Sequence, residues 1–178
     1  MGRPFVTSRE PGGTELAEDL RSLLLTPRPE IIPSETEMLL LLAGRVQHTK
    51  NLIEPALQRG ELCIVDRGPV STFAYQCWPD PTKIEFFDAA NRLLGIPHPD
   101  ITLIIDIPVE VSEQRRAARS GESDRFEMQN REYFNRTRSG MLAFVERYGG
   151  ANRIVLVDGC QSIDRVQKDM MDQIIELI

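Results

Sequence analysis

The sequence is poor in residues that hold metal ions or form crosslinks. It contains 3 cysteines and 2 histidines among 178 residues, and neither type recurs at metal-site spacing. A zinc centre and a disulfide framework are therefore not expected, and free thiols in a reducing compartment are predicted. No run approaches the roughly 20 consecutive apolar residues that a membrane-spanning helix needs. Residues 1–10 lack the apolar core of a secretion signal, so a cytoplasmic protein without membrane contacts is expected.

An excess of positive charge is also lacking. The net charge is −6, which argues against a nucleic acid polymer as partner, because such polymers favour a basic surface. A small anionic ligand is compatible with this charge, since a few local arginines suffice to bind one phosphate group. Hydrophobic residues make up 41% and charged residues 27% of the chain, which is typical of a folded globular protein. The length predicts a single domain, residues 1–178.

Short apolar segments alternate with helical segments along the chain. The predicted strands are 5–8, 61–66, 101–106 and 153–158. A long helix is predicted over 34–59, with Ser34 and Glu37 as a capping-box pair at its start. Another is predicted over 125–148. This alternation predicts an α/β fold with a mostly parallel sheet, in which ligands bind beyond the carboxyl ends of the strands.

Three motifs occur in order: REPGGT at 9–14, DRGPVSTFAYQ at 66–76 and GESDRFE at 121–127. Each resembles a signature of the bacterial thymidylate kinases, and the resemblance covers essentially the whole chain. It implies the three-layer fold of P-loop nucleoside monophosphate kinases, a lid at about 116–127 and a homodimer. The implied reaction transfers the γ-phosphoryl group of ATP to dTMP, giving ADP and dTDP.

The resemblance also implies an acceptor site. Arginines would bind the phosphate, because a guanidinium presents a planar fork of donors to phosphate oxygens. Thr72 and Gln76 would hydrogen-bond the thymine, and Tyr75 would pack under the deoxyribose. Leu41 stands where the family commonly has a phenylalanine stacked on the base, so a different or modified deoxypyrimidine is an alternative acceptor. The implied substrate-binding residues are Glu10, Arg21, Leu41, Arg45, Arg67, Thr72, Tyr75 and Gln76.

The lid would supply the chemistry. Positive side chains there would neutralise the charge that develops as the phosphoryl group moves. The implied catalytic residues are Arg116, Arg119, Arg125 and Asp66. Asp124 and Glu127 match lid acids that the family links to the nucleotide and metal network, and Mg²⁺ would arrive with ATP.

One family feature is not found in the sequence. Family members open with a strand and a GxxxxGKT loop, whose backbone N–H groups and lysine bind the ATP phosphates. We therefore expect the N-terminal strand and P-loop to be missing from this chain. In the family that strand lies between those corresponding to 61–66 and 101–106.

Three explanations stay open. The sequence begins at an internal methionine, another chain supplies the segment, or the sheet has closed up around a degenerate kinase. The expected function is a thymidylate kinase that binds ATP once the segment is supplied. The alternative is a non-catalytic nucleotide-binding or regulatory relative that keeps the acceptor site.

Overall fold

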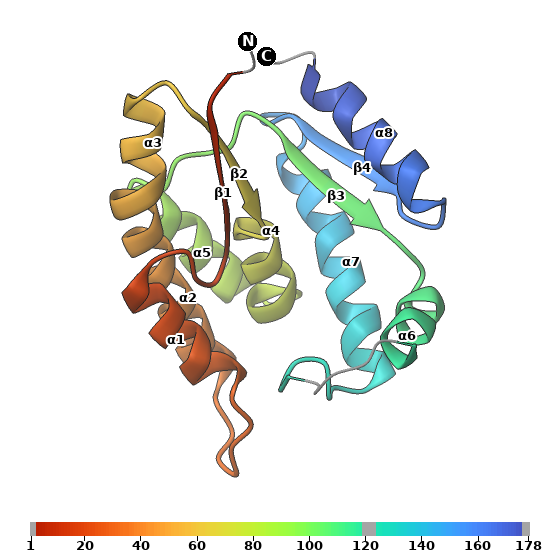
Figure 1. Ribbon diagram of the computed structural model, residues 1–178. Helices are drawn as coiled ribbons and strands as arrows, with labels where there is room; N and C mark the ends of the chain where they lie inside the picture. Colours follow the sequence, from red (N-terminus) through yellow and green to blue (C-terminus); the bar gives the residue numbers. More distant parts are fainter. Residues whose placement is uncertain (1–2, 119–123, 176–178) are drawn as a thin grey trace. The chain divides into compact units, whose positions relative to one another are not determined.

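The computed structural model describes residues 3–118 and 124–175, which fall into two compact units (Figure 1). Unit 1 contains described residues 3–97 and 124–128, and unit 2 contains 98–118 and 129–175. The expected single domain from 1 to 178 stays a prediction. Within the described ranges, no helix combines the length and apolar character that crossing a bilayer would require.

Unit 1 is built on two parallel strands, β1 (Phe5–Arg9) and β2 (Leu62–Asp66). The pairing continues one step further, because the backbone N–H of Glu10 donates to the carbonyl of Asp66 at 2.8 Å. Parallel strands place their carboxyl ends at the same edge. The first two sequence motifs, which follow β1 and β2, therefore meet at one edge of unit 1.

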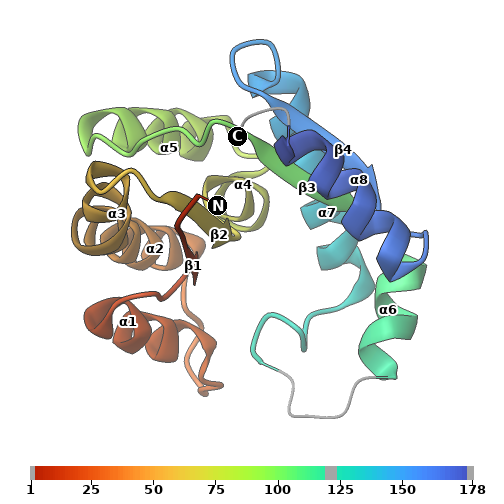
Figure 2. The same ribbon diagram turned by 45° about the horizontal axis from the view of Figure 1, so that its top comes forward.

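Helices cover one side of this strand pair. The helical elements of unit 1 are α1 (Glu15–Leu25), α2 (Ser34–His48), η1 (Thr49–Ile53), α3 (Glu54–Gln58), α4 (Pro69–Thr72), η2 (Phe73–Cys77) and α5 (Pro81–Leu93). Figures 1 and 2 show α1, α2, α3 and α5 together on the same side of β1 and β2. The core contains the fully buried Phe73, whose ring centroid lies 5.9 Å from that of Phe87 and 6.2 Å from that of Trp78.

The predicted helix over 34–59 is confirmed as one continuous helical stretch, α2–η1–α3, which ends before Gly60 at a φ of +77°. The predicted capping box at its start is wrong. Pro33 occupies the N-cap position, and no side chain caps the helix there. The Ser34 hydroxyl accepts a hydrogen bond from Lys83, while Glu37 turns inward and is only 6% exposed. Glu37 leaves the helix end because it has buried partners of its own.

Unit 2 is built on a second parallel pair, β3 (Thr102–Asp106) and β4 (Ile154–Asp158). Its helices are α6 (Val109–Ala117), α7 (Arg131–Tyr148) and α8 (Ile163–Ile175). Helices α7 and α8 both contact β4, from opposite sides of the strand pair (Figures 1 and 2).

The helix predicted from residue 125 begins later, at Arg131. The side chain of Asn130 caps α7 by accepting from the backbone N–H of Tyr133 at 2.9 Å. Residues 124–128 instead form a turn that belongs to unit 1.

The predicted parallel pairing is confirmed in both units, since β1–β2 and β3–β4 are each parallel. In the described ranges, no ladder joins β2 to β3. The missing strand that the family resemblance implies stays a prediction.

Candidate functional site

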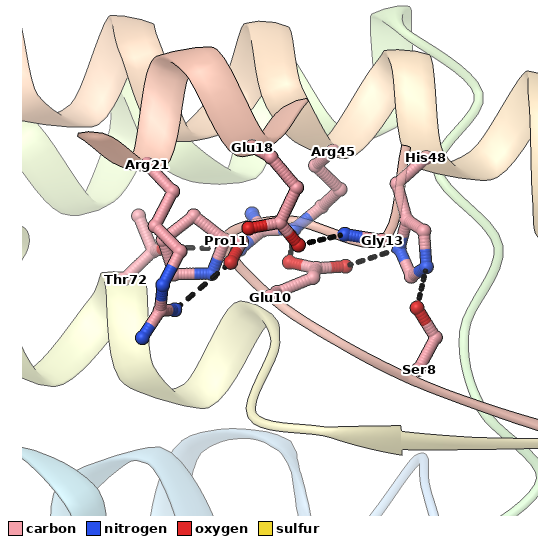
Figure 3. Close-up of polar contacts among 9 residues, drawn as sticks. All are labelled: Ser8, Glu10, Pro11, Gly13, Glu18, Arg21, Arg45, His48 and Thr72. Carbon is pink, nitrogen blue, oxygen red and sulfur yellow. Dashed lines mark hydrogen bonds and ion pairs between the residues drawn. The ribbon is translucent and has the colours of Figure 1, made fainter. Parts of the chain in front are cut away.

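The turn after β1 is held in place by side chains of α1 (Figure 3). The carboxylate of Glu18 accepts from the backbone N–H of Gly13 and from Arg9, each at 2.9 Å. These two hydrogen bonds lower the pKa of Glu18. One turn of helix later, Nη1 of Arg21 donates to the carbonyl of Pro11 at 2.9 Å. The REPGGT segment is thus anchored to α1 at three points.

Glu10 is the centre of a buried polar cluster beneath this turn. Its Oε2 accepts from Nε of Arg45 at 2.7 Å, and its Oε1 lies 3.6 Å from Nδ1 of His48. His48 is fully buried, and its Nε2 lies 2.8 Å from Oγ of Ser8. Burial disfavours the charged form of Glu10, but the charge of Arg45 and the hydrogen bonds outweigh it and lower the pKa of Glu10. Gly13 closes the cluster: its φ is +85°, and a Cβ there would come within 2.7 Å of the His48 ring.

Arg45 extends this cluster toward the second motif. Its side chain is 2% exposed, and its Nη2 donates to Oγ1 of Thr72 at 2.8 Å. Its Nη1 is buried and donates to no atom within residues 3–118 and 124–175. A buried guanidinium N–H without an acceptor carries a desolvation cost that a ligand oxygen would remove. Arg45 is therefore a rigidly held guanidinium with one unused donor.

Two neighbours of this donor lie on the helical stretch formed by α4 and η2. Thr72 is 1% exposed and Gln76 is 4% exposed, and their four-residue spacing places them on one helical face. Nε2 of Gln76 donates to the carboxylate of Glu37 at 2.9 Å. Tyr75 is half-buried, and its ring meets Phe126 edge to face at 5.9 Å.

The residue after β2 has an unusual backbone. Arg67 adopts a left-handed φ of +66°, which is uncommon for a residue with a side chain and recurs at ligand sites. Its guanidinium lies 5.9 Å from the ring centroid of Tyr75. Burial lowers the pKa of Arg21, and the positive charges of Arg9 and Arg67 lower it further. The positive charges of Arg9 and Arg67 thus both act on Arg21, and a dianion would relieve this repulsion.

The turn at 124–128 carries the two predicted lid acids. Oδ1 of Asp124 accepts from the backbone N–H groups of Phe126 and Glu127, at 2.8 and 2.9 Å. Glu127 returns the interaction by accepting from the backbone N–H of Asp124 at 3.4 Å. The acids shape this turn, whatever else they bind.

The four predicted catalytic residues fall in different parts of the chain, and their joint role stays a prediction. Arg125 belongs to unit 1, where it contacts Glu37 at 2.6 Å and the carbonyl of Leu24 at 3.0 Å. Asp66 is exposed at the end of β2. Arg116 belongs to unit 2, with its guanidinium 3.7 Å from the ring centroid of Phe134. Arg119 lies outside the described residues.

Sequence reasoning missed Glu37 and His48 as parts of the cluster. Together with the half-buried Leu41 and the buried Arg45, they line the inner side of α2 at intervals of three or four residues. That interval marks one face of a helix, so the spacing alone could have predicted that Glu37 and His48 face the same side as Arg45.

The fold and these contacts define a class of protein. Two arginines stand at one edge of the parallel strands, since Arg9 ends β1 and Arg67 follows β2. A buried guanidinium donor and an anchored amide belong to the same unit. This arrangement is that of an α/β protein that binds a small phosphorylated ligand bearing hydrogen-bonding groups. The sequence profile of the thymidylate kinase family matches residues 1–170, and the chain belongs to that family.

Known relatives support this assignment. Thymidylate kinase from Pseudomonas putida strain F1 is 42% identical over 171 residues, which are 95% of this chain and 80% of that protein. Thymidylate kinase from Pseudomonas syringae pv. tomato is 40% identical over 179 residues, covering 100% of this chain and 84% of the relative. The crystal structure of thymidylate kinase from Ehrlichia chaffeensis superposes with a TM-score of 0.73 at 26% identity, covering 96% of this chain and 81% of that one. The family resemblance read from the three motifs is confirmed.

Proposed function

We propose that unit 1 binds dTMP as a phosphoryl acceptor, in the reaction ATP + dTMP giving ADP + dTDP. The observation that carries the proposal is Arg45, which is buried, held by Glu10 and Thr72, and left with an unused Nη1 donor. Thymine offers carbonyl oxygens that accept from such a donor, and Gln76 stands one helical turn from Thr72 to pair with the same base edge.

The acceptor phosphate is assigned to Arg21 and Arg67. Both lie at the carboxyl-terminal edge of the parallel strands, where α/β proteins bind ligands, and each feels the charge of the other. Their guanidinium groups would orient a phosphate oxygen of dTMP in line with the γ-phosphorus of ATP. A bond forms from that oxygen to phosphorus, and the bond from phosphorus to the β,γ-bridging oxygen breaks. The protein positions the groups and stabilises the spreading charge without a covalent intermediate. The lid arginines Arg116, Arg119 and Arg125 are proposed to contribute to that stabilisation.

Binding of ATP requires a second phosphate-binding element. A GxxxxGKT loop does not occur in the 178 residues, so we assign turnover to a state in which such a phosphate-binding loop is supplied. No three metal-ligating side chains converge within the described part of the chain. As in the family, Mg²⁺ would enter with the ATP phosphates, where it neutralises their charge, and Asp66 is the exposed carboxylate proposed to approach it.

Calorimetry with dTMP tests the acceptor site. We expect heat of binding for the 178-residue chain, and strongly reduced binding for Arg45→Lys, which keeps the charge but loses the forked donor. Arg59→Lys is the matched control, since Arg59 is exposed and pairs only with Glu61 on the surface. No heat at millimolar dTMP would contradict the proposal.

A coupled assay of ADP formation with ATP, Mg²⁺ and dTMP then separates the two functional readings. ADP formation supports the kinase. Because the kinase is proposed to need a supplied GxxxxGKT segment, the assay is run with the 178-residue chain alone and with that segment added. Binding of dTMP without ADP formation in both cases supports the non-catalytic alternative. The homodimer implied by the family is a further part of the proposal, and light scattering of the purified chain measures it directly.

A further inference from the structure

Glu37 is a buried carboxylate that none of the roles proposed above uses. It is 6% exposed, and each of its oxygens has a different partner. Oε2 accepts from Nε2 of Gln76 at 2.9 Å, and Oε1 lies 2.6 Å from Nη1 of Arg125. These side chains are also well covered: Gln76 is 4% exposed, and the Arg125 side chain 18%. Glu37 therefore joins the amide that faces the base to an arginine of the 124–128 turn.

The chemistry of this contact decides which way the Gln76 amide points. A carboxylate beside a permanently charged guanidinium only accepts hydrogen bonds, so the arm of Gln76 that faces it must be the NH₂ group. The carbonyl Oε1 then points away from Glu37, and within residues 3–118 and 124–175 it accepts no hydrogen bond. A glutamine without such a partner presents either its oxygen or its nitrogen with similar ease.

Arg45 adds the second half of the pattern. Its unpartnered Nη1 is a donor, and Thr72 links Arg45 to the helical face that carries Gln76. A guanidinium only donates, so the pair presents one donor, held in position by Glu10, and one acceptor, Oε1 of Gln76, whose orientation Glu37 fixes. A thymine or uracil edge has carbonyl oxygens beside an N3–H donor, whereas cytosine has an acceptor at N3.

We propose that Glu37 is a specificity-determining residue: by holding the NH₂ arm of Gln76, it commits Oε1 to accept from an imide N–H, which selects thymine and uracil nucleotides over cytosine nucleotides. This inference rests on the proposed binding of dTMP. Glu37 acts through Gln76 and does not touch the base. Arg125, which neutralises the carboxylate on its other side, keeps Glu37 an acceptor.

Calorimetry with dTMP, dUMP and dCMP tests this assignment on the full 178-residue chain. The unsubstituted protein should bind dTMP and dUMP, with dCMP weaker by about tenfold or more. In Glu37→Gln the new side chain presents either an NH₂ or a carbonyl to Gln76, so Gln76 is free to turn. The ratio of the dCMP and dTMP dissociation constants should then fall toward one. Glu37→Asp keeps the carboxylate and should keep the ratio.

The matched control is Glu35→Gln, also in the first turn of α2, where Glu35 is exposed and pairs with Lys83. It should leave all three affinities unchanged. A Glu37→Gln protein that binds dTMP with the original ratio would overturn the role of Glu37 and leave the proposed function standing. Failure of the unsubstituted chain to bind any of the three nucleotides would overturn both.

A second measurement is made on the unsubstituted protein, and a variant serves only to assign its signals. The carboxamide hydrogens of Gln76, assigned in ¹⁵N spectra by their loss in Gln76→Leu, should exchange with water at least about tenfold more slowly than those of the exposed Gln58 in the unsubstituted protein. Equal exchange rates for Gln76 and Gln58 would overturn the proposal.

Discussion

Units 1 and 2 place their charged groups differently. In unit 1, Glu10, Glu37 and Arg45 are at most 9% exposed and form a buried network. In unit 2, the corresponding pairs lie at the surface, as for Arg138 and Asp106, whose side chains are 40% and 28% exposed. Buried charges need complete pairing, whereas surface pairs contribute little. The difference shows that unit 1 accepts a desolvation cost to hold polar groups in fixed positions, which is the requirement of a binding site.

The largest effect is expected when the buried network is broken. Arg45→Ala removes the only cation that contacts the buried Glu10 at hydrogen-bond distance within the described ranges, so the free energy of unfolding should fall by about 3–5 kcal/mol. Binding of dTMP should be lost as well. Urea unfolding and calorimetry measure the two effects. Arg59→Ala is the control, and its unfolding should be unchanged within error because its partner Glu61 is on the surface. If Arg45→Ala and the unsubstituted protein were equally stable, the buried network of unit 1 would contribute no more to stability than the surface pairs of unit 2.

A smaller effect, on binding alone, is expected at Arg67. Arg67→Ala should weaken dTMP binding by about 2 kcal/mol, or roughly 30-fold, through loss of charge-assisted hydrogen bonds to phosphate. Its stability should change little, since Arg67 is exposed and has a left-handed φ. Arg92→Ala, an exposed arginine at the end of α5, is the control for loss of positive charge. Equal weakening by both substitutions would indicate general charge rather than a phosphate site.

Acid should lower the stability of the two units to different extents. The pKa of Glu10 lies below its ordinary value of 4.5, so its contribution to stability is complete above pH 4.5 and is lost as the pH falls through the lower folded value. Replacing Glu10 with Gln should therefore flatten the fall in unfolding free energy as the pH drops below about 4.5. The hydrogen bonds from Arg138 likewise lower the pKa of Asp106, but this group is less buried. Asp106→Asn should therefore flatten this fall less, and a larger effect at Asp106 would reverse our ranking of the units.

The smallest effect is expected at the surface pair of unit 2. Arg138 donates to both oxygens of Asp106, at 2.7 and 2.8 Å, but solvent screens a pair exposed to this extent. Arg138→Ala should cost at most about 1 kcal/mol in unfolding free energy and leave dTMP binding unchanged. A loss of unfolding free energy as large as that of Arg45→Ala would show that the exposure of an ion pair does not determine its contribution to stability.

Much of the fold was predictable because its signals are local. The four strands were predicted to within about one residue at each end, since short apolar runs bounded by polar residues are typical of buried strands. Residue 125 was misjudged as a helix start. Its local pattern is helical, but Arg125 turns to Glu37 and Leu24, and Asn130 caps the helix instead. A competition between a helix end and a distant partner is not visible in a local pattern.

Residues of the candidate site were also predictable only where the signal is local. The three motifs identified the family and predicted the acceptor residues, because each motif is a short run of residue types with a known chemistry. Glu37 was assigned to a capping box, since Ser34 and Glu37 have the spacing of one. In the folded protein its carboxylate instead meets Gln76, 39 positions away in the chain. Glu37 bonds the amide rather than the helix end because both groups are buried, where no water molecule can replace the missing partner.

By itself, then, the sequence determined most of the elements, the parallel pairing and the family, and it predicted the residues that would meet a nucleotide. Only the tertiary structure decided which of those side chains are held in a fixed orientation and which partners hold them. The buried Glu10 holds Arg45 in position, and the Gln76 amide has one orientation because the buried Glu37 holds its NH₂ arm. The physical reason is that burial removes competing water, so a hydrogen bond between distant residues becomes strong enough to fix an orientation that neither residue type specifies alone.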